Sequence, residues 1–324
     1  MRHLPGAILQ RQSLSLKAKV SIARRRIREW HAHWDGDVYV AFSGGRDSTV
    51  LLHLVRELYP EVPAVFFDTG LEFPEIRQFV KTFSNVEWIK PKFTFREVIE
   101  RYGYPVVSKR MAQYIHEVQR SRSETATKHL RLTGYKTDGT FSKMGKISNK
   151  WLPLALQTDF PVSDRCCFAL KKRPAYAYEK RTGRKAIIGT MAVESQQRTL
   201  QWNMDGCNAF EAKRPTSKPL SVWTTADITA YLKGVNSSGK ALPYSTIYDR
   251  GYTRTGCVFC MFGVHIEHRE GLRDGLAEPN RFLRLEVTHP KLHAYCFKAW
   301  DKGGLGMAPV MDFIKIPWTA SAPG

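Results

Sequence analysis

The chain has 324 residues, 43% of them hydrophobic, which is enough to bury the core of one large domain or two smaller ones. Its apolar runs are strand-sized and its first residues, MRHLPGAILQRQS, lack the apolar segment of a secretory signal. We therefore expect no export and no membrane partner, and a cytoplasmic location is the default. Lysine and arginine number 50 against 30 acidic residues, a formal net charge of +20 that favours a polyanionic partner or substrate.

The predicted elements begin with a basic N-terminal helical extension over residues 1–34, whose helix covers 21–34. Four short apolar strands follow, alternating with helices. The predicted strands cover residues 37–42, 63–68, 87–90 and 185–189. The predicted helices contain Val50 to Leu58, 74–84 and 95–103. Continuously apolar strands alternating with helices indicate an α/β fold with a doubly wound parallel sheet covered on both faces.

The domain organisation follows from where this alternation stops. Residues 35–204 form the predicted nucleotide-binding domain, and the shorter elements of 205–324, punctuated by Pro and Gly, form a smaller irregular C-terminal part. A basic insertion is expected at about 105–150, because residues 101–150 hold 11 Lys or Arg against 3 acidic residues. Such a run is typical of a solvated insertion. Contact of these cations with the phosphates of a nucleic acid is an equally good interpretation, because the net charge of the whole chain is also positive.

The motif that carries most chemistry is SGGRDS, residues 43–48, directly after the first predicted strand. At the end of a parallel strand, a Ser-Gly-Gly turn lets the backbone approach a ligand closely, and the amides of the next helix point at an anion. The spacing matches neither the mononucleotide P-loop nor the GxGxxG of dinucleotide folds. The sequence therefore predicts a phosphate cradle, and a tight strand-to-helix turn capped by Ser is the structural alternative.

The loop SGGRDS resembles the SGGxDS pyrophosphate loop of the ATP pyrophosphatases. Further stretches, in the same order as in the family, resemble its phosphoadenosine phosphosulfate reductase branch, and together the resemblance covers roughly residues 35–265. These stretches are FFDTGLEFPE at 66–75, RCCFALKKRP at 165–174, IIGTMAVESQQR at 187–198, KPLSVWTTADITAYL at 218–232 and YDRGYTRTGCVFC at 248–260. The resemblance implies the adenine nucleotide α-hydrolase fold, in agreement with the alternating strands and helices.

The resemblance also implies where the phosphates of ATP bind. The residues expected to hold them are Ser43, Gly44, Gly45, Asp47 and Ser48, with Asp47 also placed to help bind Mg²⁺. Asp68, Thr69 and Gly70 end the second strand beside this loop. Together with Mg²⁺, the cations Arg46, Lys171, Lys172 and Arg198 would stabilise the anionic charge that develops when a phosphate bond breaks.

The roles of Arg46 and of the pair Glu194 and Arg198 are open to more than one interpretation. Arg46 stands where the family commonly has Lys, and a bidentate guanidinium differs from an ammonium point charge. Glu194 and Arg198 are expected at the nucleotide site, but their spacing also fits an ion pair on the surface of a helix.

The cysteines form two clusters, the adjacent Cys166 and Cys167 and the CVFC pair Cys257 and Cys260. Four soft ligands can hold an iron–sulfur cluster or a structural Zn²⁺. Adjacent cysteines are awkward for Zn²⁺, and CC followed by CxxC is the pattern of the adenosine phosphosulfate reductases that carry a [4Fe–4S] cluster. We therefore expect such a cluster, with Zn²⁺ and no metal as the alternatives. The remaining cysteines, Cys207 and Cys296, are expected to be buried small residues.

The choice of reaction depends on two departures from the sulfonucleotide reductases. Those enzymes use a nucleophilic cysteine in a mobile C-terminal tail, whereas residues 303–324 contain none. SGGxDS is instead the form kept by enzymes that split ATP between its α and β phosphates. We therefore expect an ATP pyrophosphatase that adenylates an acceptor oxygen, so that a sulfur donor can displace AMP, as in the similar DNA phosphorothioation and tRNA thiolation enzymes.

This hypothesis implies partners and leaves two alternatives. The acceptor would be a nucleic acid, tRNA or DNA, and the sulfur would come from a cysteine desulfurase or another donor. The first alternative is a reductase of adenosine phosphosulfate or its phosphorylated form, with Cys207, Cys296 or a partner's thiol as nucleophile. The second is a nucleotide-sensing or nucleic-acid-binding module without turnover.

Overall fold

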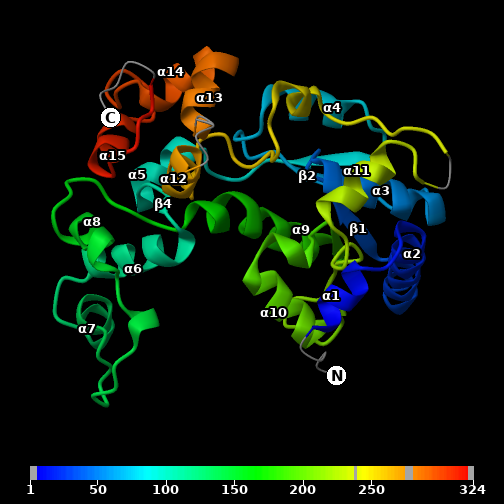
Figure 1. Cartoon of the computed structure of the whole chain (residues 1–324), viewed down its shortest axis with the longest axis horizontal. Coiled ribbons are helices and arrows are strands. Elements are labelled where there is room, and N and C mark those ends of the chain that lie inside the picture. Colours follow the sequence, from blue (N-terminus) through cyan, green and yellow to red (C-terminus); the bar gives the residue numbers. More distant parts are fainter. Residues whose placement is uncertain (1–5, 237–238, 274–279, 320–324) are drawn as a thin grey trace. The chain divides into compact units, whose positions relative to one another are not determined.

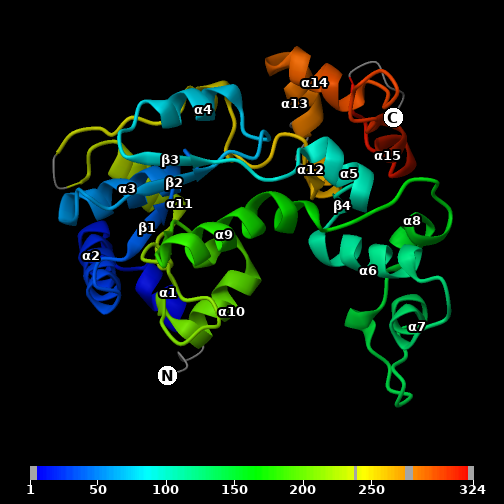
Figure 2. The ribbon, with the colours of Figure 1, turned by 180° about the vertical axis from the view of Figure 1, so that it is seen from behind.

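The computed structural model of the chain describes residues 6–236, 239–273 and 280–319 (Figures 1 and 2). It divides into two compact units, each made of two segments of the chain. The first unit comprises Met1–Pro91 and Arg173–Gly256, and the second comprises Lys92–Lys172 and Cys257–Gly324. The boundaries expected near residues 34 and 204 do not coincide with the bounds of these units.

The first unit is built on a sheet of six described strands in the order β3-β2-β1-β5-β7-β6. Neighbouring strands are parallel except β6 and β7, which are antiparallel. The strands are β1 (Val38–Ala41), β2 (Ala64–Phe67), β3 (Val86–Ile89), β5 (Lys185–Ile188), β6 (Asn208–Ala209) and β7 (Thr216–Ser217). The four predicted strands and their parallel arrangement are confirmed.

The helices of the first unit cover both faces of this sheet. Tyr39 and Val40, which point to opposite faces because they are consecutive in β1, are both fully buried. On one face Tyr39 packs edge-on against Tyr178 of α9, with ring centroids 4.9 Å apart. The helices are α1 (Ala7–Gln12), α2 (Leu16–His33), α3 (Arg46–Leu58), α4 (Pro74–Lys81), α9 (Arg173–Thr182), α10 (Gln196–Asp205) and α11 (Thr225–Leu232), with short 3-10 turns η4 (Ala192–Glu194) and η5 (Thr246–Arg250).

The N-terminal helix α2 belongs to the core of the first unit. It begins at Leu16, where the Ser15 hydroxyl accepts a hydrogen bond from the Ala18 N–H. Its side chain Trp30 is fully buried. Lys19 is also buried and forms an ion pair of 2.7 Å with Asp227, so its charge has the partner that burial requires. The predicted helix over 21–34 is thus confirmed, with an earlier start.

The second unit is mainly helical, with one pair of parallel strands, β4 (Val106–Val107) and β8 (Met261–Phe262). The basic insertion expected at about 105–150 forms helices α6 and α7 and short turns, and most of its Lys and Arg side chains are exposed. The helices are α5 (Phe95–Tyr102), α6 (Lys109–Arg120), α7 (Ala126–Thr133), α8 (Leu152–Leu156), α12 (Val264–Arg273), α13 (Arg281–Thr288), α14 (Pro290–Phe297) and α15 (Ala308–Phe313), with 3-10 turns at Lys143–Gly145 and Asn149–Trp151 and a π-helical turn at Phe168–Lys172. None of the helices described is both long and apolar enough to cross a membrane.

Candidate nucleotide site and cysteine cluster

The phosphate loop, residues 43–48, connects the end of β1 to the start of α3 in the first unit. β1 lies between β2 on one side and β5 on the other. The chain therefore leaves β1 toward one side of the sheet and later returns to pair on the opposite side. In open α/β sheets, ligands bind beyond the carboxyl ends of the strands at such a switch point. The loop stands where this fold places a ligand.

The two glycines of the loop make room for neighbouring side chains of the chain itself. Gly44 has a φ of +72°, and a Cβ at this position would lie 2.7 Å from Cγ2 of Val80 and 2.9 Å from Cγ2 of Ile76 in α4. A Cβ on Gly45 would lie 3.1 Å from the Thr255 hydroxyl. Only glycine satisfies both the backbone conformation and the packing at position 44.

The two serines of the loop hold its turn closed. The Ser48 hydroxyl donates to the Gly45 carbonyl at 2.9 Å and accepts from the Ser43 N–H at 3.2 Å, while the two hydroxyls share a hydrogen bond of 3.0 Å. Ser48 is buried and Ser43 is exposed. The serines thus stabilise a tight strand-to-helix turn, the structural alternative to a phosphate cradle, and Ser43 presents its side chain at the surface of the loop.

Tyr248 in η5 contacts the first residue of α3. Its hydroxyl accepts a hydrogen bond of 3.0 Å from the Arg46 N–H, and its ring lies 3.9 Å beneath the Arg46 guanidinium. The Tyr248 hydroxyl also shares a hydrogen bond of 3.2 Å with Thr255. Burial raises the pKa of Tyr248, so it remains protonated. Tyr248 and Thr255 were not predicted as neighbours of the loop, although both lie within the stretch 248–260 that resembles the family.

Asp47, in the first turn of α3, is the ionisable group most affected by this site. Burial raises its pKa to about 6, and the negative charge of Glu194 contributes in the same direction. The cations Arg254, Arg198 and Arg46 partly offset this rise. A carboxyl that titrates near neutrality among three guanidinium groups is typical of a functional site.

Glu194 is held by its own segment and by two arginines. Its carboxylate accepts a hydrogen bond of 2.8 Å from the Met191 N–H and another from the guanidinium of Arg198. A second ion pair, of 3.9 Å, joins it to Arg254. The helical ion pair considered from the spacing of Glu194 and Arg198 is therefore present. The same two charges also act on Asp47, so the pair belongs to the surroundings of the loop.

The residues that follow β2 lie at the same edge of the sheet as the loop, because β1 and β2 are parallel neighbours. Asp68 is buried and accepts hydrogen bonds from Arg77 at 2.8 Å and from the Gly70 N–H at 3.3 Å. The Thr69 hydroxyl donates to Glu72 at 2.7 Å. These contacts give the predicted group of Asp68, Thr69 and Gly70 a defined conformation within its own turn.

The four clustered cysteines all belong to the second unit. The Cys166 and Cys167 thiols lie 4.0 Å apart, and Cys257 and Cys260 act electrostatically on Cys166. The hydrogen bond from Cys166 lowers the pKa of Cys167 to about 6, and the charges of Lys109 and Lys171 act in the same direction. Among the described residues, no three or more His, Cys, Asp or Glu side chains are spaced to hold a metal ion.

The chemistry of this donor set nevertheless fits a thiolate-ligated metal or cluster. The two cysteine pairs, distant in the sequence, belong to the same unit, and the lowered pKa of Cys167 favours its thiolate, the form that binds soft metals. Cys207 and Cys296 are buried, as expected, and burial raises the pKa of both thiols.

Two of the cations predicted to stabilise phosphate charge belong to the second unit. Lys171 and Lys172 form the end of the π-helical turn in the second unit, beside Cys167. Lys171 acts there on the thiol of Cys167. In the first unit, Arg46, Arg198 and Arg254 act on Asp47 of the loop.

The comparison with known protein families decides the family. The model of the phosphoadenosine phosphosulfate reductase domain matches residues 37–262. The chain belongs to this family. The matched residues of this phosphoadenosine phosphosulfate reductase family member include the phosphate loop and both cysteine pairs, which confirms the resemblance seen in the sequence.

Individual relatives are distant. The adenosine 5'-phosphosulfate reductase of Lysinibacillus sphaericus is 22% identical over 235 residues, which cover 72% of this chain and 77% of the relative. The phosphoadenosine 5'-phosphosulfate reductase of Alkalilimnicola ehrlichii is 25% identical over 282 residues, 87% of this chain and 89% of the relative. A crystal structure of the phosphoadenylyl-sulfate reductase from Candida auris, a phosphate complex, matches with 18% identity and a TM-score of 0.42 over 76% of this chain and 96% of that one.

Proposed function

We propose that this member of the phosphoadenosine phosphosulfate reductase family is an ATP pyrophosphatase. It would cleave ATP to AMP and pyrophosphate and so activate an acceptor, a nucleic acid, for sulfur transfer. The observation that carries the proposal is the SGGRDS loop, residues 43–48, at the switch point of the parallel sheet. Phosphates would bind at this loop and at the amino end of α3.

The charges around the loop support cleavage as well as binding. Arg46, Arg198 and Arg254 lie around Asp47, and guanidinium groups stabilise the negative charge that builds up on departing phosphate oxygens. Asp47 provides a carboxylate, the ligand type that Mg²⁺ prefers, and binding a cation would favour its ionised form. Mg²⁺ would supply further charge neutralisation when bound. Positioning by the loop would contribute the remaining rate enhancement.

The cysteines favour this reaction over thiol-dependent reduction. Cys207 and Cys296 are buried with raised pKa values, so neither is available as a thiolate nucleophile. The other four thiols would hold a [4Fe–4S] cluster, or Zn²⁺ as the alternative. Bound there, the cluster would contribute structural stability and charge to the second unit.

The second candidate is a reductase of adenosine phosphosulfate or its phosphorylated form. Two observations favour it: the relatives described above are named as such reductases, and Cys167 has a pKa lowered to about 6. In this case a thiolate of the chain or of a partner would attack the sulfur of the substrate and displace the adenosine nucleotide. A second thiol, such as that of thioredoxin, would then release sulfite as a disulfide forms.

The acceptor and the sulfur donor follow from charge and chemistry. The exposed cations of residues 101–150 and the net charge of +20 support a nucleic acid, tRNA or DNA, as acceptor. Sulfur transfer requires a donor, and a cysteine desulfurase would supply a persulfide of suitable reactivity.

The test is an assay of AMP and pyrophosphate formed from Mg-ATP by anaerobically purified protein, with and without tRNA or DNA. We expect the two products in equal amounts, increased by one nucleic acid. Asp47→Ala should abolish them, whereas Asp205→Ala, which removes an exposed carboxylate at the end of α10, should not. Sulfite from adenosine phosphosulfate and thioredoxin, without pyrophosphate from ATP, would instead establish the second candidate.

A further inference from the structure

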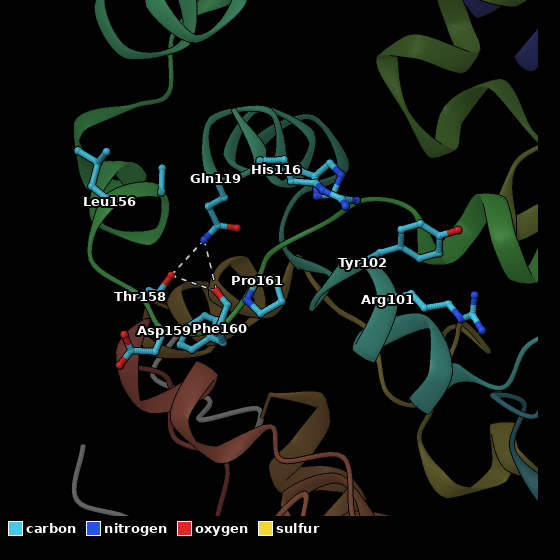
Figure 3. Close-up of a pocket in the computed structure, with 11 residues that line it drawn as sticks. Arg101, Tyr102, His116, Gln119, Leu156, Thr158, Asp159, Phe160 and Pro161 are labelled. Carbon is cyan, nitrogen blue, oxygen red and sulfur yellow. Dashed lines mark hydrogen bonds between the residues drawn. The ribbon is translucent and has the colours of Figure 1, made fainter. Parts of the chain in front are cut away.

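A cavity of about 460 Å³ lies wholly within the second unit (Figure 3). It is bordered by the end of α5, by α6, by α8 and by the segment that follows α8. None of the predicted phosphate-binding or metal-ligating residues lines it. Its volume is in the range of pockets that bind small molecules, and it is large enough for one nucleotide.

One wall of the cavity is fixed by Gln119 of α6, which projects toward the segment after α8 in Figure 3. Its amide nitrogen donates to the Leu154 carbonyl at 2.9 Å and to the Thr158 hydroxyl at 3.1 Å. Its amide oxygen accepts from the Val162 N–H at 2.8 Å. Because one side chain links three positions of the segment, the wall keeps its shape before any ligand binds.

His116, one turn before Gln119 on the same helix, offers the cavity a hydrogen-bond acceptor. Its Nδ1 lies 3.2 Å from the Val162 carbonyl, and a carbonyl can only accept, so Nδ1 carries the proton. Burial lowers the pKa of His116, and the charge of Arg120 acts in the same direction. The lowered pKa favours the neutral ring, whose Nε2 has no hydrogen-bond partner within the described part of the chain and carries a free lone pair.

Two arginines line the same cavity, Arg101 at the end of α5 and Arg120 at the end of α6. Both are exposed. Arg101 lies over the ring of Phe93 at 4.4 Å, and neither arginine has a carboxylate within ion-pair distance among the described residues. A guanidinium without a protein carboxylate retains its donor fork for a phosphate. Tyr102 and Phe160 add aromatic surface to the lining.

We propose that this cavity binds one nucleotide of a nucleic-acid strand, with Arg101 and Arg120 on its phosphate and His116 on a donor group of its base or sugar. That this strand is the acceptor rests on the proposed function. Aromatic side chains beside a basic groove suit an unpaired nucleotide. The occupant is a unit of a polymer because the cations continue beyond the cavity: residues 101–150 hold 11 Lys or Arg against 3 acidic residues.

The test compares two double variants of the whole chain that lose equal charge. Arg101→Ala with Arg120→Ala removes the two cations of the cavity, and Arg110→Ala with Arg122→Ala removes two exposed cations near the two ends of α6 that do not line it. Binding of short fluorescent single-stranded RNA and DNA is measured by anisotropy, without ATP. We expect the cavity variant to bind at least about tenfold more weakly than the control variant. The cavity variant loses charge-assisted hydrogen bonds to the phosphate, whereas the control variant loses only long-range electrostatic attraction.

A substitution that leaves the charge unchanged tests the cavity itself. Leu156 lines it and is 57% exposed, so Leu156→Trp should fold normally and fill part of the volume. We expect weaker oligonucleotide binding with an unchanged salt dependence. Equal losses in both arginine variants, or full binding by Leu156→Trp, would overturn the proposal.

Two further measurements complete the test. One distinguishes a nucleic-acid strand from a free nucleotide as the occupant of the cavity, and the other tests the proposed ATP cleavage independently of the cavity. Displacement of the oligonucleotide by free nucleoside monophosphate at the same nucleotide concentration would show that the cavity takes free nucleotides and overturn the polymer assignment. ATP cleavage without acceptor is expected to be unchanged in the cavity variants. If no variant or wild-type protein cleaves ATP, the proposed function fails, while the oligonucleotide measurements still decide the cavity.

Discussion

The backbone N–H of Arg46 donates a hydrogen bond of 3.0 Å to the hydroxyl of Tyr248, 202 residues later in the chain. This N–H belongs to the first turn of α3, whose amides have no acceptor within the helix. The Tyr248 hydroxyl therefore occupies one of the donors that a bound phosphate would use.

Replacing Tyr248 with Phe should free this donor while leaving an aromatic ring beneath the Arg46 guanidinium. We expect ATP to bind about two- to fivefold more tightly, since one competing neutral hydrogen bond is removed. Isothermal titration calorimetry would measure the change. Tyr244→Phe is the control, because the Tyr244 ring also faces Arg46, at 5.4 Å, but its hydroxyl bonds to Asp249. Weaker binding by Tyr248→Phe would mean that the hydroxyl helps to hold the nucleotide.

Gly44→Ala should destabilise the first unit more than an ordinary glycine substitution does. Gly44 and Gly139 have similar φ angles of +72° and +78°, but only Gly44 has side-chain atoms within 3 Å of the added Cβ position. We expect Gly139→Ala to cost about 1–2 kcal/mol from backbone conformation alone, and Gly44→Ala about 1–3 kcal/mol more from overpacking. Urea unfolding monitored by tryptophan fluorescence checks this, and equal costs would show that Val80 and Ile76 move aside freely.

Asp47→Asn should stabilise the protein at high pH while removing its activity. The pKa of Asp47 is raised from 3.8 to about 6, so its contribution to stability is full below about pH 3.8 and is lost as the pH rises through about 6. An amide has no charge to bury. The melting temperature of the variant relative to the wild type should therefore be higher at about pH 8 than at about pH 5. Calorimetry at both pH values measures this difference, and a pH-independent difference would contradict the raised pKa.

If the four clustered cysteines hold the proposed [4Fe–4S] cluster, Cys257→Ser should remove it and leave the proposed nucleotide binding by the first unit in place. Iron and acid-labile sulfide should fall from about four per chain to near zero, because serine does not replace a thiolate ligand. Elemental analysis and visible absorbance provide the measurement. Cys296→Ala, at a fully buried cysteine of α14, should keep the metal. Zinc in place of iron would select the alternative metal, and a wild-type protein with neither would contradict the assignment.

The parallel sheet could be predicted because its strands carry a strong local signal. β1 and β2 are short, apolar throughout and followed by helices with one apolar face, which is the pattern that burial on both sides of a sheet produces. The short strands β6 and β7, of two residues each, carry no such signal. The π-helical turn at Phe168–Lys172 could not be predicted from the spacing of apolar residues either, because its five residues depart from the α-helical repeat.

The phosphate loop could be predicted because its motif is contiguous. Residues 43–48 were found from the sequence because a strand, two glycines and a helix follow one another directly. Tyr248 and Arg254 act on the same loop from more than two hundred residues away, and no local pattern within the stretch 248–260 singled out these two side chains. His116 and Arg120 of the cavity were likewise not predicted, since a cavity is formed by packing between segments.

Because each unit is made of two separate segments of the chain, the strands of the first unit do not all become available together during synthesis at the ribosome. β1 emerges early and can pair with β2 at once, but its other neighbour, β5, follows the whole stretch 92–172 that belongs to the second unit. Until then the nascent first unit exposes one edge of what becomes an interior strand, ready to pair with other chains. A chain arrested before Lys185 would therefore be a candidate for aggregation and for capture by chaperones, although it already contains the complete phosphate loop.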